Sequence, residues 1–145
     1  MRVSYVIGVL ASLSFCGCQG SAAILKAREA GEGESRVYLV SKGQAWDIAK
    51  QVLVWEGSSS VEEHSEENYL MASFSMNLVS WGSNAGVWIE TSAENASTVT
   101  VICKRKLATN VATVMTETTF HRWFSKGVEI IKSGKALPEQ RPEAE

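Results

Sequence analysis

The sequence contains few of the residues that most often carry chemistry. Its 145 residues include three cysteines, two histidines and a single aspartate, Asp47. The formal net charge is −2, and the only dense basic run is Lys104–Arg105–Lys106. Binding to nucleic acid phosphates requires a concentrated basic surface. The sequence therefore predicts a protein that has no nucleic acid partner.

Motifs that mark common enzyme classes are also absent. The chain has no G-x-S-x-G elbow, no P-loop and no G-x-G-x-x-G fingerprint. His64 lies in the acidic segment "EEHSEE", residues 62–67, but a zinc site needs three or four ligands that converge. In an extended strand these side chains alternate between two faces. We therefore expect a solvated acidic strand edge there and no metal site.

Cys103 and His121 are the one pair that could act as nucleophile and base. Cys103 lies in the middle of a predicted strand on its apolar side, where cysteine behaves as a small inert hydrophobe. His121 lies among aromatic residues, so we expect a partly buried or boundary histidine. The sequence therefore predicts no catalytic residue and no cofactor, and we expect that the protein is not an enzyme.

The N-terminus has the features of a secretory signal peptide. Met1–Arg2 provides a positive start, an uncharged apolar run covers residues 3–13, and small residues follow it. The apolar run is too short to cross a bilayer, which needs about 20 residues. We therefore expect residues 1–17 to be a signal peptide rather than a transmembrane helix.

The segment "FCGCQG", residues 15–20, resembles the lipobox of bacterial lipoproteins, in which a lipid-modified cysteine follows a small residue and becomes the new N-terminus. Cys18 matches the modified position, and Gly17 matches the small residue. The pattern departs from the usual one at Phe15, where leucine is commonest, and at Cys16, where alanine or serine is usual. The resemblance implies diacylglycerol on the Cys18 sulfur and an acyl chain on its amino group.

A lipid on Cys18 would make a membrane the first partner of the mature chain. Each buried acyl CH₂ adds about 0.8 kcal/mol of membrane affinity, so several chains give a durable anchor. Gln19 rather than aspartate follows the cysteine. By its resemblance to Gram-negative lipoproteins, this implies the periplasmic face of the outer membrane rather than the inner membrane. Processing would leave Cys103 as the only free thiol, so no disulfide could form within the chain.

Composition divides the chain into four parts. The signal peptide of residues 1–17 precedes a lipidated N-terminus and a flexible Gly/Ser/Glu-containing tether, residues 18–35, in which residues 22–30 could form a helical turn. One domain covers residues 36–134. The polar residues 135–145, which hold both prolines of the chain, are expected to be disordered.

Within the domain, the hydrophobic patterns predict two helices and up to five strands. Ser41 and Gln44 form an S-x-x-Q capping box that opens the first helix, and Gly57 ends it. The second helix covers residues 116–133, and Phe120, Trp123 and Phe124 belong to its apolar face. The expected strands cover residues 36–40, 61–64, 69–76, 87–91 and 98–106, while residues 107–115 either extend the last strand or form a loop.

The element order β-α-β-β-β-(β)-α favours an α+β fold. Short connections between the later strands are typical of antiparallel hairpins, and both amphipathic helices need an apolar surface to cover. We therefore expect a single antiparallel sheet with the two helices packed on one face.

Trp81 lies in the segment "SWGSNAG", which is rich in glycine, serine and asparagine. Exposed aromatic residues in polar loops are common at recognition surfaces. Trp88 is expected across the same hairpin, so these two residues mark a possible recognition loop. The alternative is that Trp81 folds back over the sheet edge.

These observations favour a membrane-anchored envelope lipoprotein with a non-enzymatic binding or structural role and a possible protein partner in the envelope. The alternative is a small apolar-ligand carrier or enzyme with a pocket between the sheet and the C-terminal helix. This alternative is based on Phe120, Trp123 and Phe124, which could line a cavity.

Overall fold

The computed structural model describes residues 19–75, 82–105 and 115–143. These residues form three helices and five strands, which are α1 (Gln19–Glu29), β1 (Glu34–Tyr38), α2 (Lys42–Trp55), β2 (Ser60–His64), β3 (Tyr69–Phe74), β4 (Ser83–Ala93), β5 (Ala96–Arg105) and α3 (Glu117–Lys132). No helix among the described residues is long and apolar enough to cross a membrane.

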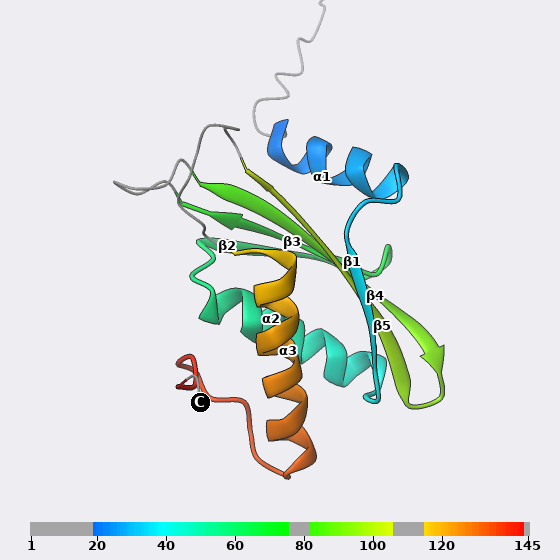
Figure 1. Ribbon diagram of the computed structural model, residues 1–145, viewed down its shortest axis with the longest axis vertical. Helices are drawn as coiled ribbons and strands as arrows, with labels where there is room; N and C mark the ends of the chain where they lie inside the picture. The colour runs from blue at the N-terminus through cyan, green and yellow to red at the C-terminus, as the bar shows by residue number, and fades with distance from the viewer. Residues whose placement is uncertain (1–18, 76–81, 106–114, 144–145) are drawn as a thin grey trace, which may run out of the picture.

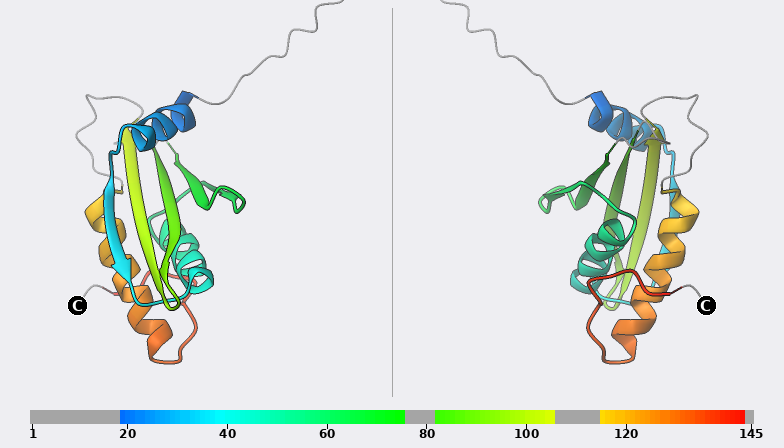
Figure 2. Two further views of the ribbon diagram at one scale, coloured as in Figure 1. Left: turned by 90° about the vertical axis from the view of Figure 1, so that its right-hand side faces the viewer. Right: turned by 90° about the vertical axis from the view of Figure 1, so that its left-hand side faces the viewer.

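The five strands form one sheet in the order β1-β5-β4-β3-β2, and all neighbours are antiparallel. α2 and α3 pack on one face, which we call the front face (Figures 1 and 2). This confirms the predicted α+β fold with two helices on one face of a single antiparallel sheet. The structure adds α1, which lies on the opposite, back face.

Strict alternation along the strands builds the front core. Leu70, Ala72 and Phe74 of β3 point to this face, as do Val99 and Val101 of β5. All five are at most 1% exposed. The predicted alternation in both strands is therefore confirmed, because successive side chains in a strand point to opposite faces.

The capping box of α2 is present as predicted. The Ser41 side chain accepts a hydrogen bond from the Gln44 backbone N–H, and the Gln44 side chain accepts one from the Ser41 backbone N–H. Gly57 follows the helix at φ 84°, a left-handed conformation that glycine adopts without steric cost. Both ends of α2 are thus determined by local sequence.

The predicted flexible tether of residues 18–35 differs from the structure. Most of it forms α1, whose Ile24 and Ala27 are 0% and 3% exposed. They pack on Met71, Trp88 and Ile102 of the back face. The apolar surface beneath α1 comes from β3, β4 and β5, which are far from α1 in the sequence. The composition of residues 18–35 therefore could not reveal that this segment packs on the sheet. The first strand also begins two residues earlier than expected, at Glu34.

The C-terminal residues also differ from the predicted disordered tail, residues 135–145. Leu137 packs against the front core. The Trp55 indole N–H donates to the Pro138 carbonyl at 2.9 Å, and the Gln51 amide donates to the Glu139 carbonyl at 3.3 Å. The segment is ordered because α2 supplies donors for its backbone. We call residues 135–143 the C-terminal segment.

The segment between β3 and β4 was expected to be a loop or a bulged hairpin. β4 begins at Ser83, so residues 83–86 are strand rather than loop. Residues 76–81 and 106–114 lie outside the described part of the chain. Of the undecided stretch 107–115 the structure describes only Met115, which is buried in the front core.

Candidate functional site

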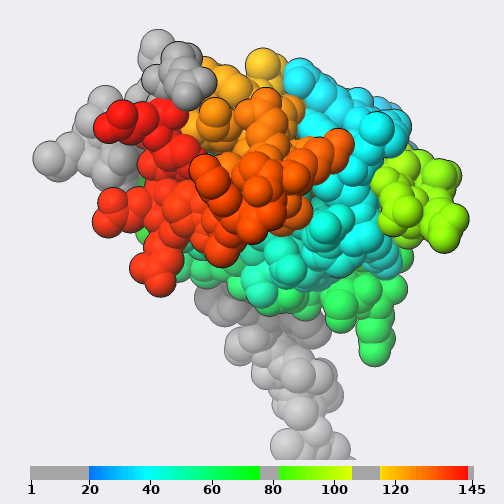
Figure 3. Space-filling view, turned by 90° about the horizontal axis from the view of Figure 1, so that it is seen from below, coloured from blue at the N-terminus to red at the C-terminus, as the bar shows by residue number. Residues whose placement is uncertain are grey.

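A polar cleft lies between the edge strand β1 and the outer side of α3. Its volume is about 500 Å³. Figure 3 views the molecule from below, where the C-terminal segment (red) lies against α3 (orange). The lining residues are Arg36, Thr118, Arg122, Trp123, Ser125, Lys126, Glu129 and Glu143.

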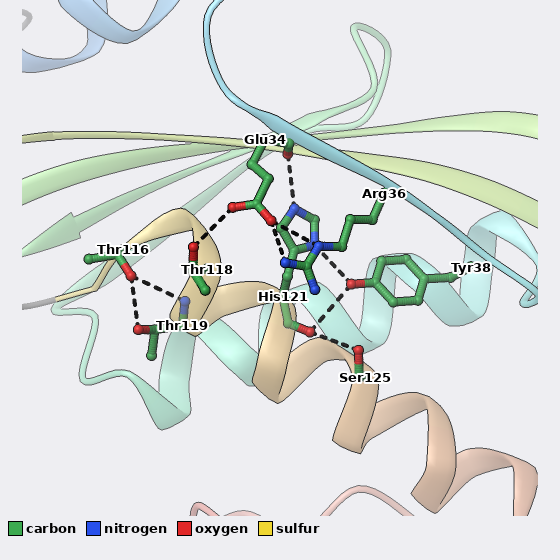
Figure 4. Close-up of polar contacts among 8 residues, drawn as sticks. All are labelled: Glu34, Arg36, Tyr38, Thr116, Thr118, Thr119, His121 and Ser125. Carbon is green, nitrogen blue, oxygen red and sulfur yellow. Dashed lines mark hydrogen bonds and ion pairs between the residues drawn. The ribbon is translucent and has the colours of Figure 1, made fainter.

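β1 directs every second side chain toward α3. Arg36 donates from Nε to the Glu34 carboxylate at 2.9 Å, and the Thr118 hydroxyl donates to the other oxygen of the same carboxylate at 3.1 Å (Figure 4). The hydrogen bond from Arg36 is the main reason that the pKa of Glu34 lies below its usual value. These contacts connect β1 to the first turn of α3.

His121 lies behind this pair and is 0% exposed. Its Nε2 is 2.9 Å from the Glu34 carbonyl, which can only accept, so Nε2 carries the proton. Nδ1 therefore accepts the hydrogen bond from the Tyr38 hydroxyl at 2.8 Å (Figure 4). The Ser125 hydroxyl donates to the His121 carbonyl at 2.9 Å. The expected boundary histidine is thus a fully buried one.

Burial sets the protonation states of this network. It lowers the pKa of His121 and raises the pKa of Tyr38, because a buried site disfavours the charged form of each. His121 is therefore neutral at pH 7. Both of its ring nitrogens are engaged, so in this conformation it has no free nitrogen for a substrate proton.

Cys103, the other member of the possible catalytic pair, is also unsuited to nucleophilic attack. Burial strongly raises the pKa of its thiol, with a further contribution from the nearby Glu117 carboxylate. Its backbone N–H donates to that carboxylate at 2.8 Å. The residue is partly buried and packs against the front core, on the apolar side of the strand that the sequence pattern predicts.

Cationic side chains line the open part of the cleft. Arg36 comes from β1, and Arg122 and Lys126 come from one side of α3. Lys126 pairs with Glu129 at 3.6 Å, and the Arg122 guanidinium lies over the Trp123 ring at 5.3 Å. Guanidinium, ammonium and hydroxyl groups together suit a ligand that carries carboxylate or phosphate oxygens.

The C-terminal segment covers two buried polar atoms beside the cleft. Trp123 Nε1 and Glu56 Oε1 have no hydrogen-bond partner among the described residues. The Arg141 guanidinium lies over the Trp123 ring at 5.4 Å, and its Nη1 is 3.6 Å from that carboxylate oxygen. Burial raises the pKa of Glu56, while the charge of Arg141 opposes this. Arg141 thus offsets the buried carboxylate of Glu56, with a smaller contribution from Arg122.

The predicted site residues do not come together in this cleft. Cys18 and Trp81 lie outside the described residues, so the lipidation site and the recognition loop stay predictions. Trp88 is 7% exposed and lies beneath α1, between the Arg28 guanidinium at 5.2 Å and the Tyr69 ring at 5.4 Å. Its ring is therefore covered.

The acidic segment around His64 forms no metal site. The His64 ring stacks on Tyr69 with centroids 4.3 Å apart, and its Nε2 is 3.7 Å from the Glu62 carboxylate. Within residues 19–75, 82–105 and 115–143, no group of three or more potential ligands could hold a metal ion. Glu63 points to the other face, where it accepts hydrogen bonds from Trp46 and Lys50.

The three aromatic residues that motivated an apolar pocket belong to the front core. Phe120 and Phe124 are 0% exposed and Trp123 is 5% exposed. They fill the space between the sheet and α3, and burial of a phenylalanine contributes about 1.5–3 kcal/mol. The cleft lies at the edge of this interface and is polar.

Sequence reasoning missed Arg36, Arg122 and Lys126. A signal for the last two was present, because Thr118, Arg122, Ser125, Lys126 and Glu129 recur at helical spacing and form a polar stripe. No sequence pattern indicates that Arg36 lies beside this stripe. Its position depends on the pairing of β1 with β5 in the sheet.

No protein-family model matches the sequence, and no curated protein matches it at a significant level. The geometry of the cleft and the N-terminal sequence therefore carry the functional argument.

Proposed function

We propose that this chain is a lipid-anchored protein of the bacterial envelope whose domain has a non-enzymatic binding role. Cys18 carries the lipid, and the anchor lies at the periplasmic face of the outer membrane. The support for this location is the signal-like N-terminus and the lipobox-like segment "FCGCQG". The described residues contain no helix that could cross a membrane, which is compatible with a lipid anchor.

The observation that carries the binding role is the charge of the cleft. Three cations and two hydroxyl groups border a volume of about 500 Å³, together with the carboxylates of Glu129 and Glu143, so the cations outnumber the anions by one. Behind them, His121, Tyr38 and Glu34 hold one another in a single arrangement. A wall whose side chains already hold one another suits recognition, because little ordering of the wall is needed on binding. We propose an envelope component with exposed carboxylate or phosphate groups as the partner.

Metabolic labelling with a clickable fatty acid tests the anchor. We expect the wild-type chain to incorporate the label and Cys18→Ala to lose it, because only the thiol of Cys18 can form the thioether. Cys103→Ala is the matched control and should label like the wild type. Labelling of Cys18→Ala at the wild-type level would contradict the anchor.

Photo-crosslinking in the native host tests the binding role. A photoreactive amino acid at Lys126 lies in the cleft, and the same group at Glu94 lies in the β4–β5 turn. We expect an adduct from position 126 that is absent at position 94, and loss of this adduct when Arg122→Glu reverses a cleft charge. An adduct that Arg122→Glu leaves unchanged, or no adduct at position 126, would refute the proposed partner site.

A further inference from the structure

The starting observation is the distance between the expected anchor and the folded domain. α1 begins at Gln19, the residue that directly follows Cys18. The helical rise places Gln19 about 7.5 Å along the axis from Ile24. The Cα atom of Cys18 lies about 3.8 Å from that of Gln19. The chain therefore provides no spacer between a lipid on Cys18 and the folded domain.

α1 is docked along its whole length rather than at one point. Gly20 lies so close to the sheet that a Cβ atom there would be 1.6 Å from Asn84 Nδ2. Ile24 lies over Gly86, where a Cβ atom would be 2.5 Å from Ile24 Cγ2. Arg28 pairs with Glu90 at 3.3 Å and lies over Trp88. The Ile24 side chain is 0% exposed, and removal of its apolar surface from water favours docking.

The first turn of α1 lies at one end of the sheet, which we call the near pole. Ser83 begins β4 there, opposite Phe74 at the end of β3 and Arg105 at the end of β5. The β4–β5 turn and the end of α3 lie at the other end of the molecule, the far pole (Figure 1).

We infer that the near pole faces the membrane surface and that the domain is held against it in one orientation. This inference rests on the proposed lipid at Cys18. A docked helix transmits the position of its first residue to the whole domain, whereas a flexible tether would not. The occupant of this surface is the lipid headgroup layer into which the acyl chains of Cys18 insert.

Basic side chains on this side of the domain are consistent with a lipid headgroup layer as the partner. Lys104 and Arg105 end β5 at the near pole, and Lys26 lies on the exposed side of α1. Basic side chains close to an anionic membrane are attracted to its negative surface potential. Lys104 already pairs with Glu32, which reduces the contribution of Lys104 to this attraction.

Headgroup quenching of a fluorescent label tests the orientation. The lipidated chain with Cys103→Ala is labelled through Ser75→Cys at the near pole or through Asn95→Cys at the far pole. Both positions are exposed, and Ser75 is distant in sequence from the anchor. In phosphatidylethanolamine and phosphatidylglycerol vesicles with nitroxide headgroups, we expect severalfold stronger quenching at position 75.

A spacer variant is the matched control. A flexible Gly/Ser insertion between Gln19 and Gly20 keeps the lipid but uncouples it from α1, so the difference between the two labels should disappear. Equal quenching at both positions in the uninserted chain, with flotation on vesicles intact, would overturn the orientation alone. Failure of the chain purified from the host membrane to float on vesicles would instead overturn the proposed anchor, and the orientation with it.

Discussion

At the scale of single residues, the network of His121 is the most informative feature. A buried imidazole that accepts from Tyr38 and donates to the Glu34 carbonyl connects the edge strand to α3. Protonation of Nδ1 would remove its acceptor and place a charge in the core, which is costly without a partner. The network therefore links the stability of the cleft wall to pH.

We expect the free energy of unfolding to fall as the pH drops below about 6.5, the pKa of an unperturbed histidine. The pKa of His121 is lowered in the folded state, so the unfolded state takes up the proton first. Urea unfolding at about pH 7.5 and about pH 5 measures this loss. His121→Gln should show a smaller loss than the wild type.

His64→Gln is the matched control for this prediction. His64 lies at the β2 edge with a side chain that is 36% exposed, so its removal should leave the pH dependence close to that of the wild type. A pH dependence that survives in His121→Gln and vanishes in His64→Gln would contradict the role of His121.

At the scale of elements, the docking of α1 depends on a glycine in β4. A Cβ atom at Gly86 would lie 2.5 Å from Ile24 Cγ2 and 2.6 Å from Trp88 Cζ3. We expect Gly86→Ala to lower the free energy of unfolding by about 1–3 kcal/mol, because overpacking forces the helix or the indole to move. Denaturant unfolding measures the change.

Gly43→Ala provides the control, since a Cβ atom at that position in α2 meets nothing within 4 Å. Alanine has the higher helix propensity, so this variant should gain up to about 1 kcal/mol. Equal effects of the two substitutions would show that close contact at Gly86 does not determine the docking of α1.

The C-terminal segment is the second element whose contacts can be tested. We expect Arg141→Ala to lower the free energy of unfolding by about 1–3 kcal/mol, because it removes the cation beside the buried Glu56 carboxylate. Glu139→Ala is the control, since Glu139 accepts from Gln51 through its backbone carbonyl. Chemical denaturation measures the free energy of unfolding of both variants. Equal values for Arg141→Ala and Glu139→Ala would refute this role of Arg141.

At the scale of the whole molecule, the sheet separates two cores of unequal size. The front core holds both α2 and α3, whereas the back core consists of Ile24, Ala27, Met71, Trp88 and Ile102. Elements with few buried contacts open locally at lower free energy. α1 should therefore open before the rest of the domain does.

Native-state hydrogen exchange measures this difference. We expect the amides of Ile24 and Ala27 to exchange faster than those of Val99 and Val101, which lie in a strand paired on both sides. Anchoring the lipidated chain to vesicles should slow exchange in α1 if the membrane stabilises its docking. Protection of α1 equal to that of β5 would contradict a separate opening step.

Features that depend on neighbouring residues were predictable from the sequence. The capping box of Ser41 and Gln44 and the alternation of β3 and β5 both involve residues within a few positions of one another. Their geometry follows from local hydrogen bonds and from the period of the apolar side chains. The α+β fold follows from the order of these elements.

The cleft could not be predicted in the same way. The proton position on His121 depends on the Glu34 carbonyl, and the shape of the cleft depends on Arg36 lying beside α3. These residues belong to segments that only the pairing of β1 with β5 brings together. Residue type alone could not reveal that His121 has no free nitrogen.

The sequence by itself determined α2, α3 and the five strands, their order and the apolar faces that pack together, because these arise from local propensity and periodicity. It also carries the lipobox-like segment, which stays a prediction. Only the tertiary structure decided that residues 19–29 cover the back face and that the C-terminal segment lies on α2 and α3. The physical reason is that each of these segments gains its stability from surfaces supplied by distant parts of the chain, such as Met71 and Ile102 beneath α1.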